Sequence, residues 1–323
     1  MMRRGCLFAV ALGVLLLGAV AWFASGWWVV AQVEEETNFL VPSGATLTSV
    51  AGKLEEEGLI GSADSFLLRA KVFGSGDPVK AGEFLLSAGA SAATILDTLQ
   101  HGEVIRRFVT IPEGLPSVLV HERLMREPLL TGTIPVPAEG SILPESYDFE
   151  RGESRAAVLE RMQRAMRDTI AELWPKRAKN IAVSTPEEAV ILASIVEKET
   201  GVPQERRMVA GLYTNRLKQG MMLQADPTII YPLTKGRPLG RRIRQSEIRA
   251  VNGYNTYSMV GLPEGPITNP GRASIEAVLN PAETDALYMV ADGTGGHAFA
   301  GTLTEHNKNV ARWFAIRRER GEM

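Results

Sequence analysis

The first 33 residues form the most apolar segment of the chain. Arg3 and Arg4 are the only charged residues in it, and the 29 residues from Gly5 to Val33 are uncharged and rich in Leu, Val, Ala and Trp. A bilayer core about 30 Å thick needs about 20 apolar residues in a helix, whereas the apolar region of a cleavable signal spans about 7–15 residues. The pattern therefore predicts a transmembrane anchor in residues 1–33.

Charge on the two sides of the anchor predicts its orientation. Arg3 and Arg4 precede it, and three glutamates follow it at 34–36. Because positive flanks stay in the cytoplasm, we expect a single-pass membrane protein with its larger part outside the cytoplasm. The tryptophans expected near the outer interface are Trp22, Trp27 and Trp28. A cleaved signal is the alternative, since residues 19–21 are small enough for a cleavage site.

Residues 34–108 carry short apolar segments that predict a small α+β unit. The expected elements are, in order, a strand at 39–41, helices at 46–57 and 62–73, a strand at 82–86 and a helix at 92–100. Residues 42–44 are a turn signal before the first helix. Val50 and Leu54 lie four residues apart and so share one face of that helix. The unit is therefore expected to pack around a core of its own.

The remainder, residues 109–323, predicts a larger mixed α/β domain. The expected elements include amphipathic helices at 155–173 and 205–218, and strands at 287–291 and 297–300 that flank a hairpin loop. Thr185 can cap a helix that begins at Pro186, with Glu188 three residues after the cap, which is the pattern of a capping box. Residues 189–196 of that helix are apolar on nearly all sides. We therefore expect this helix to be buried inside the domain.

Composition narrows the classes of function. The chain of 323 residues contains 35 basic and 37 acidic residues, and this near-balance provides no positive field for a nucleic acid. Cys6 is the single cysteine and lies in the anchor, so the rest of the chain can form neither disulfides nor a cysteine-ligated metal site. The four histidines show no paired spacing on one helix face. We expect no nucleic-acid partner, no metal and no cofactor.

Two glutamates at the end of the apolar helix are the strongest candidates for chemistry. Glu197 and Glu199 lie about 200° apart around the helix axis, so only one of them can face a given cleft. Glu199 follows apolar residues at spacings of three, four and seven, and the helix dipole is negative at this end. Both conditions disfavour the ionised carboxylate and predict a raised pKa for Glu199. Such an acid is suited to protonating a glycosidic oxygen, and the alternative is that both glutamates are solvated.

Segments downstream combine aromatic rings with amides, hydroxyls and a carboxylate. Sugar rings present an apolar face and polar edges, which these groups can bind. The candidate sugar-binding residues are Gln224, Asp226, Tyr254, Asn255, Thr256 and Tyr257. Prolines stiffen the loop at 261–271, as the wall of a cleft requires. The alternative for each segment is an ordinary turn.

Several motifs in the second part of the chain resemble one known family. Residues 192–200, Leu-Ala-Ser-Ile-Val-Glu-Lys-Glu-Thr, are similar to the signature of the YceG-like (MltG) family of endolytic murein transglycosylases. Further motifs of that family follow in the same order at residues 215–217, 223–228, 254–257, 261–263, 266–267, 269–271, 291–293, 296–297 and 306–307. In the first part, residues 41–44, 81–84 and 99–102 resemble the LysM-like subdomain of the family, which is a glycan-binding module.

The resemblance implies a domain plan and a set of site residues. It implies a LysM-like subdomain at 34–108 and a transglycosylase catalytic domain at 109–323 with a buried catalytic helix, so that the fold class is α+β. The catalytic glutamate is then Glu199, the second in the Glu-Lys-Glu-Thr run, with Glu197 as the fallback. The stretch at 143–147 corresponds to the family's Leu/Phe-Pro-Asp-Thr-Tyr motif, with Glu and Ser in place of Asp and Thr. It provides two more candidate substrate-binding residues, Glu145 and Tyr147.

The activity implied by the resemblance is cleavage of peptidoglycan between MurNAc and GlcNAc, with formation of 1,6-anhydro-MurNAc ends. Glu199 would act first as a general acid and then as a base. The implied partners are glycan strands and peptidoglycan synthases (penicillin-binding proteins), with a role in ending or trimming nascent strands. One alternative is a hydrolytic muramidase that uses Glu199 with Asp226 or Glu197. Another is a peptidoglycan-binding scaffold without catalysis.

Overall fold

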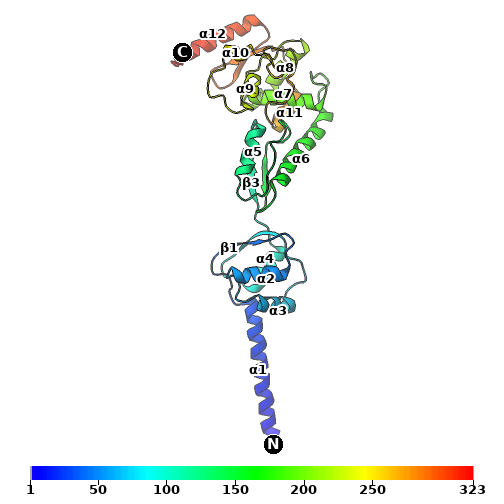
Figure 1. The fold of residues 1–323 in the computed structure, drawn as a ribbon, viewed down its shortest axis with the longest axis vertical. Coiled ribbons are helices and arrows are strands. Elements are labelled where there is room, and N and C mark those ends of the chain that lie inside the picture. The colour runs from blue at the N-terminus through cyan, green and yellow to red at the C-terminus, as the bar shows by residue number, and fades with distance from the viewer. Residues whose placement is uncertain (1, 323) are drawn as a thin grey trace. The chain divides into compact units, whose positions relative to one another are not determined.

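The computed structural model describes residues 2–322, with side chains from Val10 onward, and divides into two units (Figure 1). The N-terminal unit is Met1–Arg107 and the C-terminal unit is Phe108–Met323. Both combine helices with short two-stranded sheets, so the mixed helix and strand content predicted from the sequence is confirmed.

The apolar segment at the start of the chain forms one long helix, α1 (Met2–Trp28). Residues Val10–Trp28 have a mean hydropathy of 1.9, and almost none of this stretch is buried in the protein. In the described part of the chain it is the one helix long and apolar enough to cross a membrane. Arg3 and Arg4, which predict its orientation, lie outside the described side chains.

Trp27, one of the tryptophans expected near the outer interface, is not exposed at the end of α1. Its side chain is only 2% exposed and belongs to the core of the N-terminal unit, with its ring centroid 5.7 Å from that of Phe66. Trp22 and Trp28 remain exposed. The end of α1 is therefore part of a folded core, because one face of its last turn packs against the next helices of the chain.

The rest of the N-terminal unit follows the predicted order of elements. These are β1 (Thr37–Val41), α2 (Leu47–Glu56), α3 (Ala63–Phe73), β2 (Gly82–Leu86) and α4 (Ala92–His101). β1 and β2 pair antiparallel, with Phe39 opposite Phe84. Val50 and Leu54 are buried, as their spacing predicts, in one core with both phenylalanines. The local sequence pattern was sufficient here because each element is short and buries one face.

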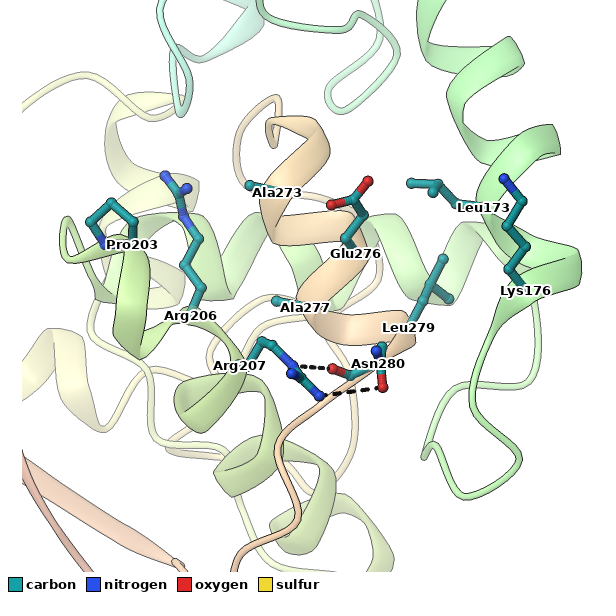
Figure 2. A pocket seen from close by; sticks show the side chains of 10 residues that line it. All are labelled: Leu173, Lys176, Pro203, Arg206, Arg207, Ala273, Glu276, Ala277, Leu279 and Asn280. Carbon is teal, nitrogen blue, oxygen red and sulfur yellow. Dashed lines mark hydrogen bonds between the residues drawn. The ribbon is translucent and has the colours of Figure 1, made fainter.

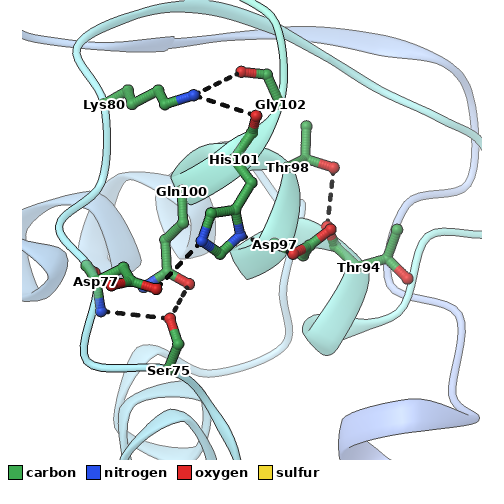
Figure 3. Close-up of polar contacts among 9 residues, drawn as sticks. All are labelled: Ser75, Asp77, Lys80, Thr94, Asp97, Thr98, Gln100, His101 and Gly102. Atoms are coloured by element: carbon green, nitrogen blue, oxygen red, sulfur yellow. Dashed lines mark hydrogen bonds and ion pairs between the residues drawn. The ribbon is translucent and has the colours of Figure 1, made fainter.

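His101, the last residue of α4, lies between two carboxylates (Figure 3). Its Nδ1 is 2.8 Å from Asp97 Oδ1, and its Nε2 is 3.2 Å from Asp77 Oδ2. The hydrogen bond to Asp97 and then the one to Asp77 raise the pKa of His101 above 6.5, because both favour the imidazolium. The ring thereby links the end of α4 to the loop that precedes β2.

We predict that His101 titrates above pH 6.5 in the folded chain and that Asp97→Asn lowers its midpoint. Since its pKa is raised by folding, its contribution to stability is complete below the unfolded-state pKa and is lost as pH rises through the folded-state pKa. NMR titration of the His101 ring measures the midpoint. Asp64→Asn, a change at an exposed aspartate outside this contact, should leave it unchanged. A wild-type midpoint at or below 6.5 would contradict the prediction.

The C-terminal unit contains two short sheets among ten helices or helical turns in its described residues. Its elements are β3 (Arg107–Thr110), α5 (Ser117–Arg126), β4 (Ser146–Phe149), α6 (Arg155–Leu173), η1 (Trp174–Lys176), α7 (Pro186–Glu199), η2 (Pro203–Glu205), α8 (Arg206–Lys218), α9 (Pro227–Thr234), α10 (Gln245–Ile248), α11 (Arg272–Leu279), β5 (Tyr288–Ala291), β6 (His297–Ala300) and α12 (Leu303–Glu319). β3 pairs with β4, and β5 and β6 form the antiparallel hairpin that the sequence predicts.

Helix α7 lies at the centre of the larger core of this unit, packed against α8 and α11. It begins as predicted, since the Thr185 hydroxyl accepts a hydrogen bond from the backbone N–H of Glu188 at 3.1 Å. The Glu188 side chain differs from the predicted capping box, because it accepts from the N–H of Ser184 at 2.6 Å. Residues from Ala189 to Val196 are buried except Ile191. This packing holds the last turn of α7, with Glu197 and Glu199, in a defined position.

Candidate active site

A cavity of about 380 Å³ opens at the carboxyl end of α7. Five segments meet there: the end of α7, α8, the start of α9 with the loop before it, the loop that contains Tyr257, and the β5–β6 hairpin. The polar residues on its wall are Lys198, Glu199, Tyr213, Arg216, Gln224, Asp226, Tyr257 and His297. The cavity thus carries an acid, a second carboxylate and several hydrogen-bonding groups.

Glu199 is the carboxyl group with the most perturbed environment in the cavity. Its Oε1 is buried and has no hydrogen-bond partner. Burial raises the pKa of Glu199 to about 7, and the charge of Asp226 adds to the rise. A hydrogen bond from Tyr213 and the charge of Arg216 oppose it. The direction agrees with the apolar face predicted for Glu199, and the contribution of Asp226 comes only from the tertiary fold.

Glu197, the fallback candidate, does not line this cavity. Its side chain is 5% exposed, its Oε2 accepts a hydrogen bond from the N–H of Gly271 at 2.9 Å, and its Oε1 lies 3.6 Å from Arg206. The two glutamates therefore face different surroundings, as their angular separation on the helix predicts. The contacts of Glu197 hold the segment before α11 against the end of α7.

Three of the predicted sugar-binding residues meet on the cavity wall: Gln224, Asp226 and Tyr257. The Tyr257 hydroxyl donates to Asp226 Oδ1 at 2.6 Å. Gln224 has a φ of 53°, a left-handed conformation that is uncommon for a residue other than glycine. Its backbone N–H donates to the carbonyl of Thr256 at 3.1 Å. The strained backbone is thus held by the neighbouring loop and turns the segment at 224–226 toward Glu199.

The other three residues of that set do not line the cavity. Asn255 is fully buried and donates through Nδ2 to the carbonyl of Ala250 at 2.6 Å. Thr256 is also fully buried, and its hydroxyl accepts from the N–H of Ala225 at 3.0 Å. The ring of Tyr254 packs at 4.8 Å from that of Tyr231. These side chains brace the loop that presents Tyr257, and their predicted contact with sugar stays a prediction.

Glu145 and Tyr147 are also remote from the cavity wall. Tyr147 lies in the smaller core of the C-terminal unit, and its hydroxyl donates to the carbonyl of Leu143 at 2.7 Å. Glu145 is exposed beside β4. The structure does not bring these two residues to Glu199, and a tyrosine that fills a core explains its place in the motif without a ligand.

Arg216 is a cavity residue that the sequence reasoning did not single out. Its side chain is buried, and it donates from Nε to the carbonyl of Leu287 at 2.6 Å and from Nη1 to that of Leu223 at 2.7 Å. The guanidinium therefore joins α8 to the hairpin and to the loop before α9, and places positive charge near Glu199. The available signal was the family motif at residues 215–217, which contains Arg216.

His297 is a second cavity residue that the reasoning missed. Its Nδ1 is 2.8 Å from Oε2 of Glu205, and its backbone N–H donates to Oε1 of the same carboxylate at 2.8 Å. Glu205 also accepts from the hydroxyl of Thr200, the residue after Glu199, at 3.2 Å. A Cβ at Gly296 would lie 2.4 Å from Glu205 Oε1, so a larger residue there would displace this carboxylate. The carboxylate fixes the imidazole and leaves its Nε2 for other contacts.

A second cavity of about 380 Å³ lies beside α8 and α11 (Figure 2). Its charged residues are Lys176, Arg206, Arg207 and Glu276, and each has a polar partner at 2.8 or 2.9 Å. It therefore offers no unpaired acid or base of the kind that Glu199 provides. Among the side chains that the structure describes, no three His, Cys, Asp or Glu residues lie together as the ligands of a metal ion would.

Comparisons with known proteins agree on one family. A family model described as the YceG-like family matches residues 39–312. A protein of Bacillus subtilis (strain 168) named endolytic murein transglycosylase is 26% identical over 315 residues, which cover 88% of this chain and 86% of that protein. A protein of the same name from Streptococcus pneumoniae serotype 2 (strain D39 / NCTC 7466) is 27% identical, over 84% of this chain and 57% of its own length. The chain thus spans little more than half of the pneumococcal protein.

A solved structure is similar as well. The crystal structure of a YceG-like protein from Listeria monocytogenes superposes with a TM-score of 0.50 at 27% identity. The match covers 85% of this chain and 99% of that chain. The likeness therefore extends over both units.

We predict that Glu199→Gln makes the chain more stable than the wild type above pH 7. The folded-state pKa of Glu199 is raised from 4.5 to about 7, so its neutral form stabilises the fold at low pH and this contribution is lost as pH rises through 7. Glutamine retains the neutral form at every pH. The gain should reach at most about 3 kcal/mol in the free energy of unfolding at pH 8 and vanish near pH 4.

Urea denaturation at the two pH values measures this difference. Glu197→Gln is the matched control two residues away, and it should destabilise the fold at both values because it weakens the contacts with Arg206 and Gly271. Equal stability of Glu199→Gln and the wild type at pH 8 would contradict a raised pKa.

Proposed function

The chain belongs to the YceG-like family, and on this basis we propose that it is an endolytic murein lytic transglycosylase. It cuts glycan strands of peptidoglycan between MurNAc and GlcNAc and leaves 1,6-anhydro-MurNAc ends. Relatives that bear this enzyme name align with 84–88% of the chain. The observation that carries the proposal is Glu199, a carboxyl group with a pKa of about 7 and an unpartnered oxygen on the wall of an open cavity.

Glu199 serves both proton transfers of the proposed reaction. The neutral acid donates its proton to the glycosidic oxygen, the bond from that oxygen to C1 of MurNAc breaks, and positive charge develops at C1. The carboxylate then accepts the proton of the C6 hydroxyl, whose oxygen bonds to C1 and closes the anhydro ring. No water is consumed, and Glu199 ends the cycle protonated. A pKa near 7 suits both steps, since neither form is strongly favoured at neutral pH.

Asp226 and Tyr257 support this cycle in the proposal. The Asp226 carboxylate is held by the Tyr257 hydroxyl and raises the pKa of Glu199. The same negative charge stabilises the positive charge that develops on the sugar. Gln224 lines the cavity beside them and supplies amide hydrogen bonds to the substrate.

A hydrolytic muramidase is the second candidate, because Asp226 provides another carboxylate in the same cavity. Hydrolytic glycosidases use two carboxylates, one as acid and one as base or nucleophile. Glu197 is not available for that role, since it faces Arg206 and Gly271. The products separate the two candidates: hydrolysed ends are reduced by borohydride and anhydro ends are not.

We predict that Glu199→Gln loses activity on purified murein by about 100-fold or more, because glutamine cannot donate or accept the proton. Mass spectrometry of the products measures the loss and identifies the ends. Glu187→Gln, an exposed glutamate in the first turn of the same helix, is the control and should retain activity. Undiminished digestion by Glu199→Gln would remove Glu199 from the mechanism and favour a scaffold, and reducible ends in the wild-type digest would favour the muramidase.

The proposal also places the chain in the inner membrane, with the C-terminal unit outside the cytoplasm. Its support is the apolar helix of 19 residues, Val10–Trp28. The LysM-like role of residues 34–108 and the trimming of nascent strands beside peptidoglycan synthases are further proposals, which come from the family resemblance.

We predict that the full-length chain sediments with membranes and that detergent, but not high salt, releases it, because an apolar helix partitions into the bilayer core. Fractionation and intact-mass measurement of the released chain test this. A soluble chain trimmed near Ala21 would show a cleaved signal instead.

A further inference from the structure

The end of α1 enters the N-terminal unit without a linker. The ring of Phe73 in α3 lies 5.6 Å from that of Phe23 and 4.6 Å from that of Trp28. Arg69 of α3 donates from Nε to the carbonyl of Phe23 at 3.1 Å. Figure 1 shows α3 beside the point where α1 joins the folded part of this unit. Whatever surrounds the end of α1 therefore also meets α3.

Helix length places the membrane surface at this junction. About 20 residues cross the bilayer core at 1.5 Å per residue. Counted from Gly5, the first uncharged residue, such a span ends near Ala24. That is the same turn whose Phe23 contacts Arg69 and Phe73, and the 19-residue stretch from Val10 ends at Trp28, which also contacts Phe73. If α1 crosses the membrane as proposed above, α3 lies at the lipid surface.

Two large apolar side chains are exposed on α3, on a side that also carries Asp64, Ser65 and Lys71. Leu68 is 54% exposed and Val72, one helical turn later, is 58% exposed. Trp22 of α1 is 73% exposed, and Lys71 supplies an exposed positive charge. Helices that lie in a membrane interface combine apolar residues on one face with basic flanks and tryptophan.

A cavity of about 340 Å³ lies at the same junction, lined in part by Trp22, Ser62, Ser65 and Arg69. The Arg69 guanidinium lies 5.2 Å from the Phe23 ring centroid. It is also close to Gly26, since a Cβ on residue 26 would lie 2.6 Å from Arg69 Nη2. Among the described side chains, no carboxylate forms an ion pair with Arg69, and its hydrogen bond to Phe23 uses only Nε. The terminal amino groups of the guanidinium remain for an anion.

We propose that this junction is a lipid-binding surface of the N-terminal unit. Leu68 and Val72 contact the boundary between headgroups and acyl chains, and the cavity seats the phosphate of an anionic phospholipid on Arg69. The headgroup then provides the counter-charge that the protein does not supply, while the serine hydroxyls offer further hydrogen bonds. This inference rests on the proposed membrane location and not on the proposed catalysis.

Depth measurements test the apolar face. Because Cys6 is the single cysteine, Cys6→Ser allows one nitroxide label at a time on the full-length chain in nanodiscs. With Val72→Cys, collisions with oxygen should exceed those with a water-soluble nickel complex. Leu85→Cys, at an exposed apolar position of β2, is the control and should show the reverse. Equal exposure of both labels to nickel, with α1 still inserted, would overturn the lipid contact and leave membrane anchoring intact.

Native mass spectrometry tests the headgroup site in nanodiscs of mixed phosphatidylglycerol and phosphatidylcholine. Arg69→Gln should lower the preference for phosphatidylglycerol about five-fold, since one basic residue at a membrane surface is worth about a factor of this size. Arg69→Lys retains the charge and should retain most of the preference. The matched control is Lys71→Gln, which removes a charge from α3 outside the cavity and should have a smaller effect.

Three results would overturn the site. They are equal losses in Arg69→Gln and Lys71→Gln, no loss in Arg69→Gln, or displacement of the lipid by millimolar inorganic phosphate, which would identify a site for free phosphate. Circular dichroism shows whether Arg69→Gln folds. If it does not fold, the double variant Arg69→Lys/Ser65→Ala replaces it in the same measurement. An unchanged preference for phosphatidylglycerol in that double variant would count against the cavity as the binding site.

Discussion

The chemistry proposed for the candidate site depends on the free-energy cost of ionising the carboxyl group of Glu199 where it is buried away from water. Burial alone disfavours the charged form of Glu199, and its Oε1 has no hydrogen-bond partner that would offset this cost. A solvated glutamate would be ionised at neutral pH and could not act as an acid. The rigid position of α7 in the core maintains the burial, since a mobile helix end would admit water and restore the ordinary pKa.

Two further charged groups on the wall of the same cavity change that cost, one in the loop after α8 and one in α8 itself. Asp226 brings a like charge, and Arg216 brings an opposing one that is held by backbone carbonyls. Asn255 and Thr256 use their polar groups on the loop itself, which keeps Tyr257 in contact with Asp226. Part of the polar segment at 254–257 therefore has a structural role in holding the loop, because buried amides and hydroxyls must find hydrogen-bond partners inside the protein.

In the N-terminal unit, helix α1 is exposed along most of its length and belongs to the folded core at its end. An apolar helix was expected to end at the membrane surface, yet its last turn contributes Trp27 to a globular core. The same helix thus has two surroundings: almost none of Val10–Trp28 is buried in the protein, while Trp27 in its last turn packs among other side chains. This continuity restricts how the unit can tilt on α1, and it exposes the apolar face of α3 beside the junction.

Local patterns in the sequence were enough to predict the long apolar helix, the order of elements in the N-terminal unit, the start of α7 at Thr185 and the β5–β6 hairpin, because caps, turns and periodicity act within a few residues. They also predicted that Glu197 and Glu199 face different surroundings, since helix geometry alone determines that angle. Only the tertiary structure decided which side chains meet Glu199. Arg216 is held at the cavity by Leu287, which is 71 positions away in the sequence, and His297 is held by Glu205, which is 92 positions away. Tyr147 packs into a core. Such choices depend on which surfaces pack together, and no local pattern encodes them.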